Sequence, residues 1–488
     1  MSQEVAIIGA GPAGLAAARW LKQHGFTPIL IEAHSEIGGQ WSGLNPLSGI
    51  WPEMRTNTAK ITTQFSDIDY PEGVAVFPRN QEVLAYFTRY AQMFGLLENA
   101  RLATKVTALD RQGAAYRLTL ETAGGTETLV VPRVIVASGR YNKPAIPRIE
   151  GLESFSGELG ARHAFFYKSP DEFRGRRVVV AGGSISALEI ASDLSMLGSR
   201  AVWLAQRRQR YVMPKMVRGV PLEYYAFTLG GALVRDNATP DELARAQLEF
   251  VMACGGDPAR YGAPKPHADI RKAGFTGSQH YLNLVAENRL SVRPWIAKVD
   301  GQSVTFTDGS SVEADAIIIG TGFDLDLPYL SAEIARSLKI DTKGMEIANF
   351  TFHPDLPRLA LMGLWPQQGP YPVPFEQQAR YIAYTWSGTI PAPSRAELDA
   401  AVKASREEGH FDDYRDQNEM ALRFARLCGT DPARIDDATL QRTLAASATT
   451  AIMFRMCGPD ALPDATERFY RQFRQFGPML PEVEALAS

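Results

Sequence analysis

Short apolar runs separated by a glycine-rich turn and an Ala-rich segment open the chain. Val5 to Ile8 is apolar, Gly9 to Gly14 forms the turn, and Leu15 to Lys22 has the composition of a helix. A second apolar run, Ile29 to Ile31, ends at Glu32. The order of strand, glycine turn, helix, strand and acid predicts a βαβ unit that binds a dinucleotide.

The residues of this first turn have distinct physical roles. Gly9 permits a tight turn, Gly11 lets a pyrophosphate approach the backbone, and Gly14 lets the helix lie close to the sheet. Pro12 suits the first helical turn, and the positive end of the helix attracts phosphates. Glu32 can accept hydrogen bonds from ribose hydroxyls but repels a 2′-phosphate. The first site is therefore expected to hold FAD or NAD; an ordinary glycine turn is the alternative.

The same pattern returns in altered form in the middle of the chain. Arg177 to Ala181 predicts a strand, Gly182 to Ala187 a turn, Leu188 to Leu197 a helix and Ala201 to Leu204 a strand. This strand runs into Gln206-Arg207-Arg208 instead of an acid. Guanidinium groups bind phosphate through forked, charge-assisted hydrogen bonds. The second site is therefore expected to take NADP(H); a solvated basic turn is the alternative.

Two positions of the second turn differ from the glycine pattern. Ser184 replaces the second glycine and Ala187 the third. Serine still allows a fairly close approach of a phosphate, and its hydroxyl can donate to one.

Further elements follow from the spacing of apolar positions. Asn80 is expected to cap a helix from Val83 to Phe94, which Gly95 ends. Arg101 to Leu109 predicts a strand, and Tyr116 to Val131 predicts two strands joined at Gly124-Gly125.

Two buried strands end in small residues and resemble each other. Val134 to Val136 runs into Ala137-Ser138-Gly139, and Asp315 to Ile319 runs into Gly320-Thr321-Gly322-Phe323. The likeness predicts that the chain returns to the first sheet at the second strand.

The remaining segments are less regular. Thr239 and Glu242 predict a capping box for a helix from Pro240 to Met252. Ser303 to Thr307 and Ser311-Val312 predict a hairpin. A loop from Gly363 to Pro374 precedes a helix from Phe375 to Trp386, and Ser394 with Glu397 predicts another capped helix in a charged tail.

Together these elements predict an α/β fold with two Rossmann-like dinucleotide-binding domains. The FAD domain is interrupted by an inserted NADP domain, and a helical extension follows. The expected parts are 1–165 for the first part of the FAD domain, 166–312 for the NADP domain with an insertion, 313–393 for the second part of the FAD domain, and 394–488 for the extension.

Composition excludes several classes of protein. The net charge of −3 over 488 residues, without a dense basic run, disfavours nucleic-acid binding. We expect no membrane span, no signal peptide and a cytoplasmic location. Cys254, Cys428 and Cys457 are isolated, so neither a disulfide framework, a zinc site nor a dithiol flavin reductase is expected. We expect no metal site.

Two nucleotide sites, one ending in an acid and one in arginines, indicate hydride transfer from NADPH to a flavin. Because no second redox group is visible, dioxygen is the expected electron acceptor.

The chain resembles the class B flavin-containing monooxygenases over most of its length. The order and spacing of several motifs carry the resemblance: Gly9 to Gly14, Gly38-Gly39-Gln40-Trp41, Ala137-Ser138-Gly139, Gly182 to Ala187, Gln206-Arg207-Arg208 and Gly320-Thr321-Gly322-Phe323. The family's identifying pattern is present in looser form as Phe155-Ser156-Gly157 and His163 to Tyr167, with two extra residues between Gly157 and His163.

The resemblance implies an enzyme that uses FAD, NADPH, O2 and a small-molecule substrate. A C4a-hydroperoxyflavin would oxygenate a soft nucleophile, an amine nitrogen or sulfur, while bound NADP⁺ shields it from water. A homodimer is compatible with the resemblance. The implied cofactor-binding residues are Gly9, Gly11, Pro12, Ala13, Gly14, Glu32, Gly39, Gln40, Trp41, Val106, Ala137, Ser138, Gly139, Tyr167, Gly182, Ser184, Ser186, Ala187, Arg207, Arg208, Thr321 and Gly322.

Within the family, two residues favour the branch that oxygenates nitrogen and sulfur. Tyr167 stands where Baeyer–Villiger relatives typically have Trp. Asn57 matches an Asn that supports the oxygenated flavin and is the expected catalytic residue; a turn residue bonded to its own backbone is the alternative. The rival functions are a Baeyer–Villiger monooxygenase acting on ketones, an NADPH-dependent flavin reductase or oxidase, and a non-catalytic flavin-binding module.

Overall fold

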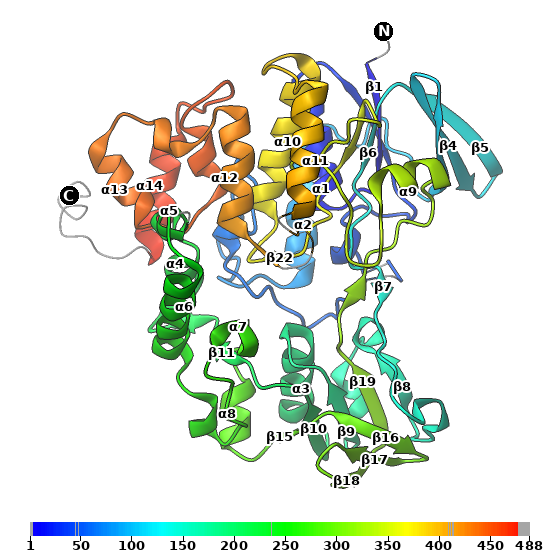
Figure 1. The fold of residues 1–488 in the computed structure, drawn as a ribbon, viewed down its shortest axis with the longest axis vertical. Helices are drawn as coiled ribbons and strands as arrows, with labels where there is room; N and C mark the ends of the chain where they lie inside the picture. The colour runs from blue at the N-terminus through cyan, green and yellow to red at the C-terminus, as the bar shows by residue number, and fades with distance from the viewer. Residues whose placement is uncertain are drawn as a thin grey trace.

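Two parallel sheets organise the molecule, one in each of two lobes (Figure 1). The computed structural model describes residues 3–476, except 44, 47, 236, 408, 410, 412 and 413, so the end of the predicted tail, 477–488, lies outside the described residues. The first sheet has the order β2 (Thr27–Ile31), β1 (Glu4–Ile8), β6 (Val134–Val136) and β21 (Leu359–Leu361). The predicted α/β fold with two Rossmann-like units is confirmed.

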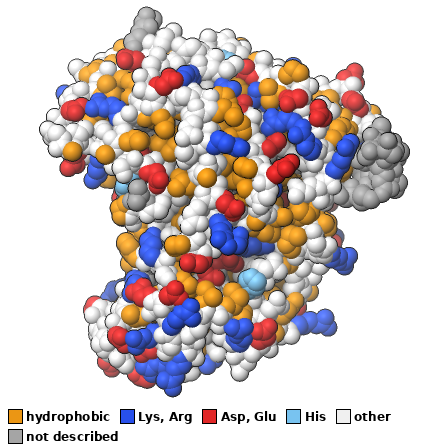
Figure 2. Space-filling view, turned by 180° about the vertical axis from the view of Figure 1, so that it is seen from behind, with side chains coloured by type: hydrophobic (Ala, Val, Ile, Leu, Met, Phe, Trp, Pro, Cys, Tyr) orange, Lys and Arg blue, Asp and Glu red, His pale blue; other side chains and the backbone are white. Residues whose placement is uncertain are grey.

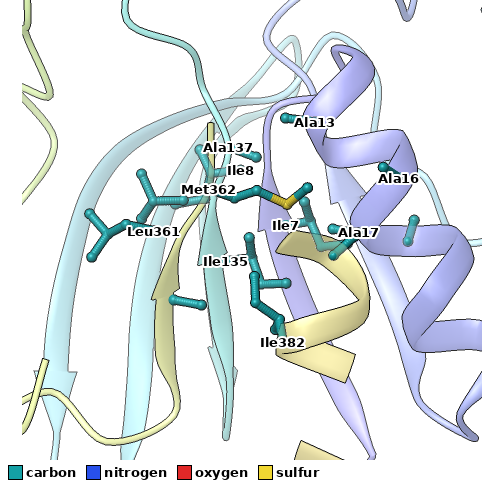
Figure 3. Packing of buried hydrophobic residues seen from close by; sticks show 14 of the residues in the cluster. Ile7, Ile8, Ala13, Ala16, Ala17, Ile135, Ala137, Leu361, Met362 and Ile382 are labelled. Carbon is teal, nitrogen blue, oxygen red and sulfur yellow. The ribbon is translucent and has the colours of Figure 1, made fainter. Parts of the chain in front are cut away.

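Helices pack against the first sheet, whose strands are continuously apolar and buried. Figure 3 shows Ile7 of β1, Ile135 of β6 and Leu361 of β21 within one cluster. Ala13, Ala16 and Ala17 of α1 (Pro12–Gln23) and Ile382 of α10 (Pro372–Ser387) belong to the same cluster. The small side chains of α1 let this helix lie close to β1.

The second sheet contains five parallel strands. Their order is β15 (Ser291–Arg293), β10 (Ala201–Ala205), β9 (Arg177–Ala181), β19 (Ala316–Ile319) and β8 (Gly160–His163). The prediction that the strand at 315–319 returns to the first sheet is wrong, because β19 pairs with β9 and β8. The likeness between β6 and β19 has another cause: β6 lies beside β1 in the first unit as β19 lies beside β9 in the second.

The two lobes are linked by a short pair of crossing segments. The chain leaves the first lobe through β7 (Lys143–Pro144) and returns through β20 (Phe323–Asp324), and these two segments pair antiparallel. The second sheet thus includes β8 and β19, which lie outside the predicted range 166–312. The predicted domain limits stay a prediction.

Each lobe also carries a three-stranded antiparallel sheet. In the first lobe it comprises β3 (Lys105–Gln112), β4 (Ala115–Thr122) and β5 (Gly125–Val131); in the second it comprises β16 (Ile296–Asp300), β17 (Ser303–Phe306) and β18 (Ser311–Glu313). Both predicted hairpins are confirmed. The strand expected from Arg101 begins only at Lys105, because the backbone of Arg101 and Thr104 bonds instead to Leu30 and Glu32.

The helices agree with the predicted capping signals, with one exception. α6 (Pro240–Gly255) has the predicted Thr239–Glu242 capping box, and α11 (Arg395–Glu407) follows Ser394, whose Oγ accepts the amide of Glu397. α2 (Asn80–Met93) begins three residues before the predicted helix, and Arg79, not Asn80, is its cap. The helix after the second turn is α3 (Ile185–Met196).

The remaining elements lie in the insertion and the C-terminal part. The insertion contains β11 (Tyr211–Met213), β12 (Met216–Val217), β13 (Val220–Pro221), α4 (Glu223–Ala226), α5 (Leu229–Arg235), α7 (Ile270–Ala273), β14 (Phe275–Gly277) and α8 (Tyr281–Ala286). The C-terminal part contains α9 (Ala332–Leu338), β22 (Gln367–Gln368), β23 (Arg415–Asp416), α12 (Gln417–Cys428), α13 (Ala438–Ala445) and α14 (Ala465–Phe476). Figure 1 places α4 and α5 between the C-terminal helices and the second lobe.

The surface agrees with the near-zero net charge. Figure 2 shows acidic and basic side chains interspersed with hydrophobic ones over the face seen from behind. Among the described residues, no helix is both long and apolar enough to cross a membrane.

Candidate active site

The first glycine turn brings three backbone segments into close contact. A Cβ on Gly9, whose φ is +104°, would lie 2.6 Å from the carbonyl oxygen of Ala137. A Cβ on Gly14 would lie 2.0 Å from the carbonyl oxygen of Gly9. The turn from β1 into α1 therefore has room only for glycine at both positions. Ala137, Ser138 and Gly139 follow β6 directly and thus lie beside this turn, and Pro12 and Ala13 begin α1.

Glu32, at the end of β2, is buried beside the turn. Its Oε2 accepts the amide of Ala10 at 2.9 Å, and its Oε1 accepts the amide of His34 at 3.1 Å. A carboxylate has about four lone-pair sites, so further acceptor capacity is left for a hydroxyl. The Thr104 amide donates to the Glu32 carbonyl at 2.8 Å, which places buried Val106 near the same end of the sheet.

The predicted glycine–Trp loop lies against the N-terminus of α1. It forms a short 3₁₀ turn, Gly39–Trp41, and the amide of Gly38 donates to the Ala10 carbonyl at 2.9 Å. A Cβ on Gly39 would lie 3.0 Å from the Cα of Gly11. Gln40 Nε2 donates to the Tyr141 carbonyl at 3.1 Å. Trp41 is half-buried and packs on the first core.

The second glycine turn repeats this construction. A Cβ on Gly182 would lie 2.3 Å from the carbonyl oxygen of Gly320, directly after β19. Ala187 is buried against Gly320, whereas Ser184 and Ser186 are exposed at the start of α3. A helix N-terminus with exposed hydroxyls is suited to bind phosphate.

Arg207 and Arg208 extend from the end of β10 and are both exposed. The guanidinium of Arg207 lies 4.7 Å from the ring centroid of Trp295, a cation–π arrangement that orients it. Arg208 Nη1 donates to the Lys272 carbonyl at 2.6 Å, so it is held by α7's last turn. The two arginines that the sequence predicts after this strand are therefore present, and a different contact orients each guanidinium group.

Thr321 and Gly322 lie at the crossing between the lobes. Thr321 Oγ1 donates to the Ala145 carbonyl at 2.6 Å, and the Ala145 amide donates to the Gly322 carbonyl at 3.0 Å. Because β19 belongs to the second sheet, these residues approach the second glycine turn. Their predicted place in the second part of the FAD domain stays a prediction.

A small cavity lies next to the second turn. Its lining includes Trp51, His163, Phe165, Ser186, Gly320 and Phe323. His163 Nδ1 accepts the amide of Phe165 at 3.2 Å, which places the ring proton on Nε2. Burial lowers the pKa of His163, partly offset by a hydrogen bond with the Gly322 backbone. Residues of both lobes thus form an apolar, aromatic space at the nucleotide turn.

Tyr167 is fully buried just behind this cavity. Its ring lies 5.3 Å from that of Trp51, edge-on, and stacks on Phe173 at 5.7 Å. Burial raises the pKa of Tyr167 well above its usual value. The Trp51 indole donates to Asp193 at 3.0 Å, and burial raises the pKa of Asp193 to about 6.

Asn57 lies half-buried in a loop that is anchored on both sides. The Thr56 amide donates to the Pro78 carbonyl at 2.9 Å, and Thr56 Oγ1 donates to the Thr58 carbonyl at 2.7 Å. The Ala59 amide donates to Glu223 Oε1 of the insertion at 2.8 Å. Among the described residues, no hydrogen bond joins the Asn57 side chain to the rest of the protein, so the alternative of a turn residue bonded to its own backbone receives no support.

Comparison with known proteins shows the family. A model of the flavin-binding monooxygenase-like family matches residues 2–467. The chain belongs to this family. Flavin-containing monooxygenase 5 of Oryctolagus cuniculus is 27% identical over 421 residues, which cover 83% of this chain and 77% of that protein.

Two solved structures share the fold of this flavin-binding monooxygenase. The S-allyl-L-cysteine S-oxygenase of Allium sativum matches with a TM-score of 0.65 at 22% identity, over 97% of this chain and 99% of that one. The closed form of cyclohexanone monooxygenase matches with a TM-score of 0.65 at 16% identity, over 88% and 98%.

The flavin-binding monooxygenase is an enzyme that uses FAD and NADPH to put one oxygen atom of O2 into a small molecule. Its own residues fit both cofactors. The first turn has no space for a Cβ at Gly9 or Gly14, and it has Glu32 beside it, which suits the unphosphorylated ribose of FAD. The second turn has exposed serines and two ordered arginines, as a site for NADPH requires.

Sequence reasoning missed three members of this region. Trp51 carries no local motif, and Phe323 belongs to a predicted motif that gave no sign of its cavity partners; only the packing of the two lobes brings them to one cavity. Glu223 lies more than 160 positions from the loop that it anchors. A buried acid in an otherwise apolar stretch was the only signal for it in the sequence.

Proposed function

We propose that this flavin-dependent monooxygenase oxygenates a soft nucleophile, an amine nitrogen or sulfur of a small molecule. The observation that carries the proposal is the pairing of an acid-terminated and an arginine-terminated nucleotide turn around an aromatic junction. When bound, FAD supplies hydride uptake and O2 activation. Two residues support nitrogen and sulfur as the atoms that accept the oxygen. Tyr167 stands where a Trp would favour ketone oxidation, and Asn57 lies in an anchored loop.

We assign the binding of FAD to the first turn and its surroundings. The helix N-terminus of α1 binds the pyrophosphate, Glu32 accepts from the ribose, and Val106 contacts the adenine side. Gly39, Gln40, Trp41 and the segment Ala137 to Gly139 complete that site.

We assign the binding of NADPH to the second turn. Gly182, Ser184, Ser186 and Ala187 bind the pyrophosphate, Arg207 and Arg208 bind the 2′-phosphate, and Thr321, Gly322 and buried Tyr167 support the nicotinamide side. The lining of the cavity beside His163 is mostly apolar, which supports the exclusion of water on this side.

Asn57 is the proposed catalytic residue, with its amide at the junction of flavin and nicotinamide. Asn57→Ala is expected to leave flavin reduction by NADPH intact but to release peroxide instead of oxygenated product. The measurement compares product and peroxide formed for each NADPH consumed. Asn283→Ala, which removes an exposed Asn on α8, is the control. Full coupling in Asn57→Ala would contradict the role.

The rival activities give different products. With a thioether the proposed enzyme forms a sulfoxide, whereas a Baeyer–Villiger enzyme converts a cyclic ketone into a lactone. A reductase or oxidase consumes NADPH at a rate that is indifferent to either compound.

We also propose the domain limits, the location and the oligomeric state. The sheet pairing supports a second domain that begins after β7 and ends before β20. The three thiols, none in a disulfide, support a cytoplasmic location. A homodimer is proposed from the family resemblance, and light scattering of the purified enzyme tests it.

A further inference from the structure

We propose that Glu223 is a positioning residue that holds the Asn57 loop in place, so that the insertion takes part in coupling NADPH oxidation to oxygenation. The inference rests on the role proposed for Asn57. Glu223 contacts Ala59, two residues along the loop, and not the reacting atoms.

The contact of Glu223 with the loop is direct and buried. Its Oε1 accepts the Ala59 amide at 2.8 Å, and the residue is 2% exposed. Ala59 itself is 1% exposed and packs with Ile61, Tyr224 and Ala448. Losing this hydrogen bond leaves a buried donor unpaired, which costs more than an average hydrogen bond contributes. This hydrogen bond, together with the packing of Ala59 on Tyr224, therefore holds the loop on the side of the insertion.

The second oxygen of the carboxyl group, Oε2, is buried and has no hydrogen-bond partner elsewhere in the described part of the chain. Burial raises the pKa of Glu223 to about 7, although hydrogen bonds from its own amide and the Ala59 amide, and the charge of Lys215, oppose this rise. An acid kept in such a place costs stability that an apolar residue would not. A role in positioning the loop explains why an acid stands at this site despite its cost in stability.

α4, which carries Glu223, is in turn held by the C-terminal part. The Tyr224 hydroxyl donates to the Gln472 carbonyl of α14 at 3.3 Å, and the Thr449 amide donates to the Phe227 carbonyl at 2.9 Å. Asn418 of α12 donates to the Thr228 carbonyl at 3.0 Å. Figure 1 shows α5 and then α4 below the C-terminal helices. The C-terminal part therefore holds α4 in place, and Glu223 on α4 can in turn set the position of the loop.

The segment that follows Glu223 also contacts a second loop near the site. A Cβ on Gly369 would lie 3.0 Å from the ring of Phe227. Gly369 belongs to the irregular segment between β22 and α10. Phe227 thus packs against the loop that contains Gly369, while Glu223 holds the loop that contains Asn57.

The test compares Glu223→Leu with Glu223→Gln in the FAD-loaded, full-length enzyme. Leucine removes the acceptor for the Ala59 amide, whereas the glutamine carbonyl retains it. The ratio of oxygenated thioether to peroxide is expected to fall about tenfold in Glu223→Leu and to be largely retained in Glu223→Gln. Anaerobic reduction of the flavin by NADPH is expected to be unchanged in both variants.

Two further variants separate a local from a general effect. Tyr225→Phe changes an exposed residue of the same helix that takes no part in the argued contacts, and it is expected to stay coupled. Ala59→Pro deletes the amide that Glu223 accepts without changing the insertion, and the φ of −66° at Ala59 suits proline. Ala59→Pro is expected to uncouple like Glu223→Leu and serves if that variant does not fold.

The outcomes distinguish this inference from the proposed function. If Asn57→Ala uncouples the enzyme while Glu223→Leu and Ala59→Pro remain coupled, the positioning role is overturned and the role of Asn57 stands. If Asn57→Ala remains coupled, the proposed role of Asn57 fails first. If Glu223→Leu and Asn57→Ala each uncouple and the double variant is no worse than Asn57→Ala, the two residues act as one unit.

Discussion

At the scale of single residues, the two nucleotide turns depend on contacts that leave no space for a side chain. Gly9 meets the carbonyl of Ala137, and Gly182 meets that of Gly320, so both turns use the same backbone approach. The sequence predicted these glycines because their spacing is local. It did not predict their partners, because Ala137 and Gly320 come near only after the strands pair.

The contact between Gly14 and the Gly9 carbonyl gives a stability prediction. Gly14→Ala places a Cβ 2.0 Å from the Gly9 carbonyl and is expected to cost about 3 kcal/mol or more, with loss of bound FAD. The matched control is Gly25→Ala, where φ is +81° and no atom lies within 4 Å. It is expected to cost only about 1 kcal/mol. Urea unfolding and flavin content of both variants check the difference.

The charge at the end of β10 gives a specificity prediction. Arg207→Ala is expected to weaken NADPH binding roughly ten- to a hundredfold while NADH binding changes little, because only NADPH has a 2′-phosphate. Titration of each nucleotide into the enzyme measures both constants. Arg200→Ala removes the same charge from an exposed position just before the other end of β10 and serves as the control. Equal weakening of both nucleotides would contradict the assignment.

At the scale of elements, the sequence predicted the type of most strands and helices but not every neighbour. Local signals such as the Thr239–Glu242 capping box were sufficient for α6. β6 and β19 read alike because both are fully buried and end in small residues. Only the register of β19 with β9 and β8 shows which sheet it joins, and no property of the strand itself contains that information.

The crossing between the lobes gives a prediction at the same scale. Thr321→Val keeps the shape of the side chain but removes its hydrogen bond to the Ala145 carbonyl. We expect a loss of about 1 kcal/mol in unfolding free energy and slower anaerobic reduction of the flavin by NADPH. Thr305→Val, which removes an exposed hydroxyl pair with Ser311, is the control. An unchanged reduction rate would show that the crossing does not set the distance between the lobes.

At the scale of the whole molecule, buried charges join the C-terminal part to the first nucleotide helix. The guanidinium groups of Arg19, Arg380 and Arg455 lie 5.1, 4.9 and 4.9 Å from the ring of Trp20 on α1. Arg455 pairs with Asp67 at 3.0 Å. Removing one partner of a buried pair is costly, so the C-terminal part is expected to be needed for a stable first lobe. The sequence showed these charges but not their burial.

Asp460 gives a pH-dependent prediction for this cluster. Burial alone would raise the pKa of Asp460, but hydrogen bonds from His24 and Tyr384 hold this pKa well below its usual range. A lowered folded pKa stabilises the fold above the unfolded pKa, about 4, and this stabilisation is lost as pH falls further. Asp460→Asn is therefore expected to lower unfolding free energy by about 2 kcal/mol at pH 7.

The pH series tests this sign directly. The unfolding free energies of Asp460→Asn and the parent enzyme are expected to differ from pH 8 to about pH 5 and to converge as the pH falls below about 4. A difference that is still growing below about pH 4 would contradict the account.

The central claim is that two nucleotide turns cooperate to put one oxygen atom of O2 into a soft nucleophile. The most direct measurement is turnover with NADPH and a thioether under ¹⁸O2, with mass spectrometry of the product and titration of peroxide. The account predicts a sulfoxide that carries one ¹⁸O atom and an amount of product that matches the NADPH consumed. Peroxide in place of sulfoxide, at a rate independent of the thioether, would contradict it.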